Sequence, residues 1–185
     1  MTSSFHRKRN GFSLVEMMLV ISVIALMITM LSIGFTSSFV GAELSGTARR
    51  MAAELEHGAQ MAAVQNRPIT VRFTSDLREP DEYLQGFQFG VTDSVTGEFK
   101  ANSEFFRFPD GITIHLSERT TTLLRLADSP TTFEFHFYAD GSTSLRKDLH
   151  WCVTLVRFGH ATNSELPSSY RTVVINPYNG STTLY

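Results

Sequence analysis

Cysteine is almost absent from this chain, with Cys152 alone among 185 residues. A single cysteine can form no disulfide within the chain and cannot supply a cysteine-rich metal site. Because it follows Trp151 in an apolar stretch, we expect a buried or half-buried thiol.

Local catalytic patterns are absent as well. The sequence has no His-Glu-x-x-His pair, no Gly-x-Ser-x-Gly turn around Ser142 and no glycine-rich phosphate loop. We therefore expect no enzymatic activity, no cofactor and no metal ion. Oxygen ligands for a hard cation occur in one acidic stretch, but its spacing matches no recognisable site, so a solvated loop is the simpler interpretation. This stretch contains Asp76, Glu79, Asp81 and Glu82.

Net charge is small, with 16 basic and 18 acidic residues. Three basic residues, Arg7, Lys8 and Arg9, precede Gly11, and no acidic residue does. The chain after Gly11 therefore has 13 basic and 18 acidic residues, a balance of −5. Such a domain is not expected to bind nucleic acid in general. A local basic patch would have to come from dispersed residues: Arg119, Arg125, Arg146, Lys147, Arg157 and Arg171.

One long apolar run stands near the start, from Phe12 to Phe35, and no Asp, Glu, Lys or Arg occurs from Met17 to Ala42. As a helix, residues 12–35 would be about 36 Å long, enough to cross a bilayer core of ~30 Å. The basic residues before the run predict a cytoplasmic N-terminus. Glu16 interrupts the apolar character, and a carboxylate in such a segment is costly.

Two simple interpretations leave Glu16 without a role. A secretory signal peptide could be cleaved near Val40-Gly41-Ala42, but the apolar run is longer than such peptides need. A plain membrane anchor explains the length and the basic flank only. It could tether a periplasmic enzyme or binding module.

The stretch Gly11-Phe12-Ser13-Leu14-Val15-Glu16 resembles the processing site of type IV pilins and type II secretion pseudopilins. The resemblance implies that a prepilin peptidase cuts after Gly11 and methylates the new amine of Phe12. It also implies that Glu16 pairs with the N-terminal amine of a neighbouring subunit in a filament. Buried charges of opposite sign need such partners.

Four segments follow from these patterns: a leader at 1–11, a transmembrane and filament-core helix at 12–42, an amphipathic continuation at 43–66 and a periplasmic domain at 67–185. The continuation ends at Asn66-Arg67-Pro68, since Pro68 disfavours helical geometry at Arg67. Its apolar residues recur every three or four positions on one face. They are Leu44, Ala48, Met51, Leu55, Ala59 and Ala62.

The domain after Pro68 is predicted to be β structure, with alternating apolar residues and turn signals between short strands. A clear case is 132–138, where Phe133, Phe135 and Phe137 share one face. The turn Asn179-Gly180 indicates a terminal hairpin. The expected strands are 69–74, 86–92, 104–108, 112–116, 123–127, 132–138, 142–146, 151–158, 172–176 and 182–185.

Three segments narrow the resemblance to minor subunits of the GspH/FimT family: AAELEHGAQMAAVQNRPITVRF, FEFHFYADGSTSL and YRTVVINPYNGSTTLY. The family implies an α+β, pilin-like fold in which the long helix packs on an antiparallel β-sandwich. It implies a minor pseudopilin of a type II secretion system, or alternatively a type IV minor pilin for pilus assembly, twitching or DNA uptake.

The same resemblance implies the location and the partners. The subunit would cross the inner membrane once, with its domain in the periplasm, and would contact membrane lipid. Its protein partners would be the major and minor pseudopilins, the prepilin peptidase and the inner-membrane secretion platform. Some pilin relatives bind DNA through a basic C-terminal region, but residues 172–185 contain no Lys or Arg, so nucleic acid is not expected.

Overall fold

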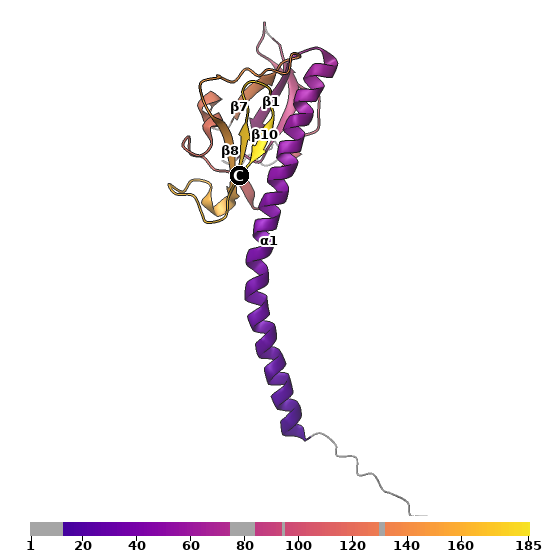
Figure 1. The fold of residues 1–185 in the computed structure, drawn as a ribbon, viewed down its shortest axis with the longest axis vertical. Helices are drawn as coiled ribbons and strands as arrows, with labels where there is room; N and C mark the ends of the chain where they lie inside the picture. The colour runs from indigo at the N-terminus through magenta and orange to yellow at the C-terminus, as the bar shows by residue number, and fades with distance from the viewer. Residues whose placement is uncertain (1–12, 75–83, 94, 130–131) are drawn as a thin grey trace, which may run out of the picture. The chain divides into compact units, whose positions relative to one another are not determined.

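The computed structural model describes residues 13–74, 84–93, 95–129 and 132–185, with the backbone alone for 30–40. The chain divides into two compact units, Met1–Val40 and Gly41–Tyr185. One element, helix α1 (Leu14–Gln65), contributes to both (Figure 1).

In the first unit, α1 exposes its large apolar side chains as far as Ile28 on every side. Within the part of the chain that the structure describes, no helix is long and apolar enough to cross a membrane.

In the second unit, α1 ends in a geometry that satisfies its last carbonyl groups. Asn66 has a positive φ of 48°, a left-handed conformation that asparagine tolerates better than most residues. The Asn66 N–H donates to the Ala63 carbonyl and the Arg67 N–H donates to the Ala62 carbonyl. These two bonds form the Schellman motif, which stops the helix just before Pro68.

The first of two antiparallel sheets has the order β3-β2-β1-β7-β6, with β4 also paired to β2. Its central strands β1 and β7 match Thr70 with His136, Arg72 with Glu134 and Phe73 with Phe133. Burial alternates along β7, so its three phenylalanines face the core and its polar residues face outward. The strands are β1 (Ile69–Thr74), β2 (Gly86–Thr92), β3 (Phe99–Ala101), β4 (Phe106–Arg107), β6 (Ala127–Ser129) and β7 (Thr132–Phe137).

The second sheet has the order β10-β9-β8-β5. It consists of β5 (Ile112–Ile114), β8 (Trp151–Arg157), β9 (Arg171–Ile175) and β10 (Thr182–Leu184), with short 3-10 helices η1 (Thr122–Leu126) and η2 (Phe158–His160) beside it. The hairpin β9–β10 turns through Gly180, which has a positive φ of 66°. The predicted terminal hairpin is therefore confirmed.

The second half of α1 packs against these sheets and completes the core (Figure 1). Its buried face includes Leu44, Thr47, Ala48, Met51, Leu55, Gly58 and Ala62. Ala59 belongs to the predicted stripe but is only half-buried, because Gly58 is the residue of α1 that faces β2 here. A Cβ on Gly58 would overlap the ring of Phe89, so the helix approaches β2 closely there. The expected α+β fold, with a helix packed on antiparallel sheets, is confirmed.

Two predicted strands are wrong. Residues 123–127 mostly form η1, whose Thr122 hydroxyl accepts a bond from the Cys152 N–H and donates to the His150 carbonyl. Residues 142–146 form only an isolated bridge between Thr143 and Phe137. Side chains bind the backbone groups of this segment in place of a neighbouring strand. The Thr143 hydroxyl accepts a hydrogen bond from the Leu145 N–H, and the Trp151 indole donates one to the Arg146 carbonyl.

Other strands differ in extent. The predicted strand 104–108 is reduced to β4, and 112–116 is reduced to β5. The His115 N–H still donates to the Thr154 carbonyl in the β5–β8 register, but the Leu116 N–H donates to the Ala161 carbonyl, outside β8. The sequence analysis missed β3 and β6, which are three residues each. Such short strands contain too few alternating positions to be distinguished from loops.

Candidate functional site

The N-terminal motif is the first candidate site, and the structure describes it from Ser13 onward. Gly11 and Phe12 lie outside the described residues. The Ser13 hydroxyl accepts a hydrogen bond from the Glu16 N–H at 3.2 Å, and the Ser13 carbonyl accepts one from the Met17 N–H. Ser13 is therefore the N-cap of α1, and Glu16 stands three residues later, as in a capping box.

Glu16 is exposed in the first turn of α1. A negative charge there interacts favourably with the helix dipole. The Ser-x-x-Glu pattern is visible in the sequence, and it identifies a local role for Glu16 that our sequence analysis missed. The carboxylate can serve the helix start and still meet a cation from another chain.

The apolar surface that follows Glu16 is continuous around the helix. Leu14 is 78% exposed, and even Val20 is 42% exposed. A helix that is apolar on all sides is normally covered by a membrane or by other helices, and large exposed apolar surfaces mark interaction sites. This surface is therefore suited to binding lipid or other apolar helices.

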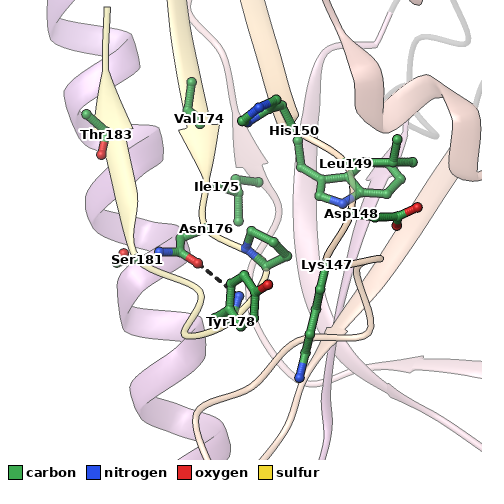
Figure 2. Close-up of a pocket in the computed structure, with 12 residues that line it drawn as sticks. Lys147, Asp148, Leu149, His150, Val174, Ile175, Asn176, Tyr178, Ser181 and Thr183 are labelled. Atoms are coloured by element: carbon green, nitrogen blue, oxygen red, sulfur yellow. Dashed lines mark hydrogen bonds between the residues drawn. The ribbon is translucent and has the colours of Figure 1, made fainter.

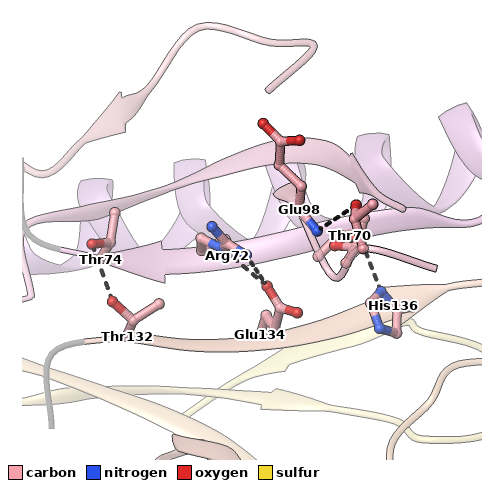
Figure 3. A network of polar contacts seen from close by, with 9 residues as sticks. Thr70, Arg72, Thr74, Glu98, Thr132, Glu134 and His136 are labelled. Carbon is pink, nitrogen blue, oxygen red and sulfur yellow. Dashed lines mark hydrogen bonds and ion pairs between the residues drawn. The ribbon is translucent and has the colours of Figure 1, made fainter. Parts of the chain in front are cut away.

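A polar ladder on the outer face of the first sheet is the second candidate (Figure 3). Arg72 binds Glu134 across β1 and β7 through Nε and Nη2, at 2.9 and 2.8 Å, and its guanidinium lies 4.0 Å from the centroid of the Phe99 ring. Next to it, the Thr70 hydroxyl lies 2.9 Å from His136 Nδ1. Burial lowers the pKa of His136, and the nearby Glu134 opposes this effect.

These contacts explain the ladder as cross-strand pairing, since each pair is directly opposite in the β1–β7 register. The Thr70 hydroxyl beside His136 is shared with the Thr92 hydroxyl at 2.9 Å, so it too takes part in cross-strand pairing. The ladder therefore stabilises the sheet. The structure shows His136 half-buried.

An open groove of about 380 Å³ lies between the loop 147–150 and the β9–β10 hairpin (Figure 2). Lys147 Nζ lies 5.3 Å from the centroid of the Tyr178 ring, and the Tyr178 N–H donates to the Asn176 side chain. Asp148 forms a two-point pair with Arg146. The polar groups of the groove thus have partners within the chain.

The other residues considered from the sequence do not come together. His115 is fully buried, and its ring contacts the Thr120 hydroxyl and the Asn163 carbonyl. Cys152 is half-buried, as expected, with its thiol 3.3 Å from the Thr120 carbonyl. Among the described residues, no group of His, Cys, Asp or Glu side chains could hold a metal ion. The acidic stretch with Asp76, Glu79, Asp81 and Glu82 lies outside them.

The candidate basic residues are held separately. Arg125 lies 3.8 Å from Glu118, Arg146 binds Asp148, and Arg171 donates to the Ser45 hydroxyl. Lys147 faces Tyr178. The charges are thus distributed over different loops and largely matched by acids or aromatic rings.

Comparison with known proteins supports the N-terminal motif and the fold. The family model described as the prokaryotic N-terminal methylation motif matches residues 6–32. No curated protein sequence matches the chain significantly.

Three solved structures resemble the chain. The type IV minor pilin FimU of Pseudomonas aeruginosa (strain PAO1) is 18% identical, with a TM-score of 0.51 over 78% of this chain and 89% of that chain. A second crystal form of FimU gives a TM-score of 0.50 at 18% identity, over 77% and 92%. The minor pseudopilin EpsH from the type 2 secretion system of Vibrio cholerae is 13% identical, with a TM-score of 0.47 over 77% and 96%.

The methylation motif lies at the start of a helix with an exposed apolar surface, and the domain that follows has the fold of a minor pilin. The chain therefore combines a prokaryotic N-terminal methylation motif with a pilin-like α+β fold.

Proposed function

We propose that this protein is a minor structural subunit of a filament built from pilin-like proteins, and more narrowly a minor pseudopilin of a type II secretion system. The observation that supports this most directly is the methylation motif at residues 6–32, which overlaps the exposed apolar surface of α1. Free in water that surface would be unfavourable by roughly 25 cal/mol per Å². A bilayer before assembly and neighbouring helices afterwards would both cover it.

In this proposal, residues 1–11 are the leader and residues 12–42 form the transmembrane and filament-core segment. The basic leader keeps the N-terminus in the cytoplasm, and the domain from residue 67 enters the periplasm. A prepilin peptidase cuts after Gly11 and methylates Phe12. Glu16 then pairs with the N-terminal amine of the neighbouring subunit, which sets the axial offset between subunits. The chain itself performs no catalysis.

Partners follow from this role. The subunit would contact the other pseudopilins in the filament and the inner-membrane secretion platform during assembly. Through the filament it would help to move folded proteins across the outer membrane. The acidic balance after Gly11 and the uncharged hairpin at 172–185 favour secretion over a DNA-binding pilus.

A second candidate is a type IV minor pilin. The fold shared with the type IV minor pilin FimU favours it. The two roles use the same helix and the same processing site, so they differ only in whether the subunit joins a type II secretion system or a type IV pilus.

Deletion of the gene and complementation in its own organism test the proposal. If the narrower role holds, deletion abolishes the release of folded exoproteins and leaves twitching and DNA uptake intact. Loss of pilus functions with normal secretion would establish the second candidate instead. A Gly11→Leu complement should behave like the deletion, because the peptidase could not cut. If deletion affects neither process, the filament role is wrong.

A further inference from the structure

The second unit exposes eight large apolar or aromatic side chains among its described residues, and half of them lie at one end. The eight are Val64, Val95, Tyr138, Phe158, Tyr170, Tyr178, Leu184 and Tyr185. Four of them, Phe158, Tyr170, Leu184 and Tyr185, lie where β8 and β10 end and β9 begins. With Arg157 and Arg171 they form what we call the basal end. The chain's C-terminus marks it in Figure 1.

Backbone contacts hold these residues in place and leave their side chains outward. The Tyr185 N–H and carbonyl pair with the Thr172 carbonyl and N–H, at 2.9 Å each. The Tyr170 carbonyl accepts a bond from Arg171 Nη1 at 2.7 Å. The side chain of Tyr185 is 72% exposed. Tyr170 and Tyr185 can therefore be substituted by smaller residues without loss of the hydrogen bonds that their backbone groups form.

The basal end lies beside the first turn that α1 contributes to the second unit. Arg171 Nε donates to the Ser45 hydroxyl at 2.9 Å, and that hydroxyl donates to the Gly41 carbonyl. Ser45 follows the end of the charge-free run, at Ala42, by only three residues. Chain connectivity thus keeps Arg171 within about 10 Å of Ala42, at 1.5 Å per helical residue plus a side-chain contact.

We propose that the basal end rests on the membrane surface, with Tyr170 and Tyr185 in the interfacial layer of the lipid. This inference rests on the proposed membrane anchor. Tyrosine favours that layer because its ring is apolar while its hydroxyl remains hydrated. The contact orients the domain before the subunit leaves the bilayer for the filament.

Charge does not drive this contact. The basal end has only two cations, and one of them, Arg171, already donates to the Tyr170 carbonyl and the Ser45 hydroxyl. The basal end should therefore contact zwitterionic and anionic lipids alike, and added salt should have little effect.

Fluorescence quenching in vesicles tests the contact with the full chain. A Cys152→Ser background would carry one probe, either at Ser168→Cys, near Tyr170, or at Val95→Cys. Val95 lies in the turn after β2, at the opposite end of the domain, since Gly90 of β2 pairs with Thr70 soon after α1 ends. The vesicles would contain phosphatidylcholine, with or without phosphatidylglycerol, and a phosphatidylcholine with a spin label on its headgroup as quencher.

We expect stronger quenching at Ser168→Cys than at Val95→Cys in both lipid mixtures. The double variant Tyr170→Ser/Tyr185→Ser should reduce this difference, whereas the matched variant Tyr138→Ser/Tyr178→Ser should keep it. An unchanged difference in the double variant would overturn the inference, because the tether alone would then account for it. Equal quenching at both positions, in a chain that resists alkaline carbonate extraction, would overturn the inference and leave the anchor standing. A chain that carbonate extracts would overturn both. A difference seen only with other subunits present would show that the basal end binds protein instead.

Discussion

We propose two roles for Glu16, which act through different atoms. Its backbone N–H donates to the Ser13 hydroxyl and so helps to start α1. Its exposed carboxylate is available to a cation from another chain. The Glu16 N–H can thus help to cap the helix while the Glu16 carboxylate is used in the proposed assembly. Substitutions of Glu16 can separate these two roles.

Glu16→Gln keeps the capping-box pattern but removes the charge, so it should insert and be processed normally yet fail to assemble. Losing one partner of a buried ion pair costs roughly 3–5 kcal/mol. Glu16→Leu should fail equally, and Glu16→Asp should be intermediate because its carboxylate has a shorter reach. Cross-linking to the other filament subunits, beside a secretion assay, is the measurement. Normal assembly of Glu16→Gln would show that only the helix cap matters.

Gly58 and Gly46 form a matched pair on the same helix. A Cβ at Gly58 would overlap the Phe89 ring, whose Cζ would lie 2.9 Å away, whereas nothing lies within 4 Å at Gly46. Gly58→Ala should therefore destabilise the domain by about 1–3 kcal/mol through overpacking. Gly46→Ala should stabilise it by roughly 0.5–1 kcal/mol through helix propensity. Denaturant unfolding of both variants compares them, and equal effects would show that Gly58 is not a packing constraint.

At the scale of elements, the two faces of β7 differ in kind. The inward face brings Phe133 within 4.7 Å of Phe73, centroid to centroid, and the outward face carries the polar ladder. Alternation along the strand predicted the faces. The partners came from the β1–β7 register, which pairs Arg72 with Glu134, 62 positions further along the chain.

His136 in this ladder should make stability depend on pH. Burial lowers its pKa below the ordinary value of 6.5, so the unfolded chain takes up a proton before the folded chain does. Stability is therefore complete above about pH 7 and should fall as the pH drops toward ~5. His136→Gln keeps a polar partner for Thr70 and removes the titration, so its stability curve should be flatter. Parallel curves for the two proteins, from unfolding at several pH values, would contradict this.

At the scale of the whole molecule, the proposed cleavage after Gly11 would define the mature chain. Mass spectrometry of protein extracted from membranes should show a chain that begins at methylated Phe12, because the motif around Gly11 matches the peptidase requirement. A start at Glu43 would indicate an ordinary signal peptide. An intact Met1 would indicate a plain anchor.

The overall charge predicts weak binding to DNA. The balance of −5 after Gly11 repels phosphates, and residues 172–185 carry no Lys or Arg. Titration of the full chain in detergent with duplex DNA at physiological salt should show no nanomolar binding. Tight binding that weakens steeply with added salt would reverse this expectation and favour the pilus role.

Local patterns were sufficient for several features. Strands β1, β2 and β7, the terminal hairpin and the buried stripe of α1 follow from short-range alternation and turn residues, which act within a few positions of the chain. The methylation motif is readable for the same reason, because a peptidase recognises contiguous residues. The capping relation of Ser13 and Glu16 was equally local, although we missed it.

Only the tertiary structure decided the remaining features. Residues 122–126 form a 3-10 helix, in which the Thr122 hydroxyl binds the backbone of β8. Residues 142–146 form no strand, because side chains bind backbone groups in this segment. The basal end brings together Phe158, Tyr170 and Tyr185 from three separate segments, and Arg171 links this end to Ser45 of α1. Such contacts join residues far apart in the chain, so no local period of the sequence could reveal them.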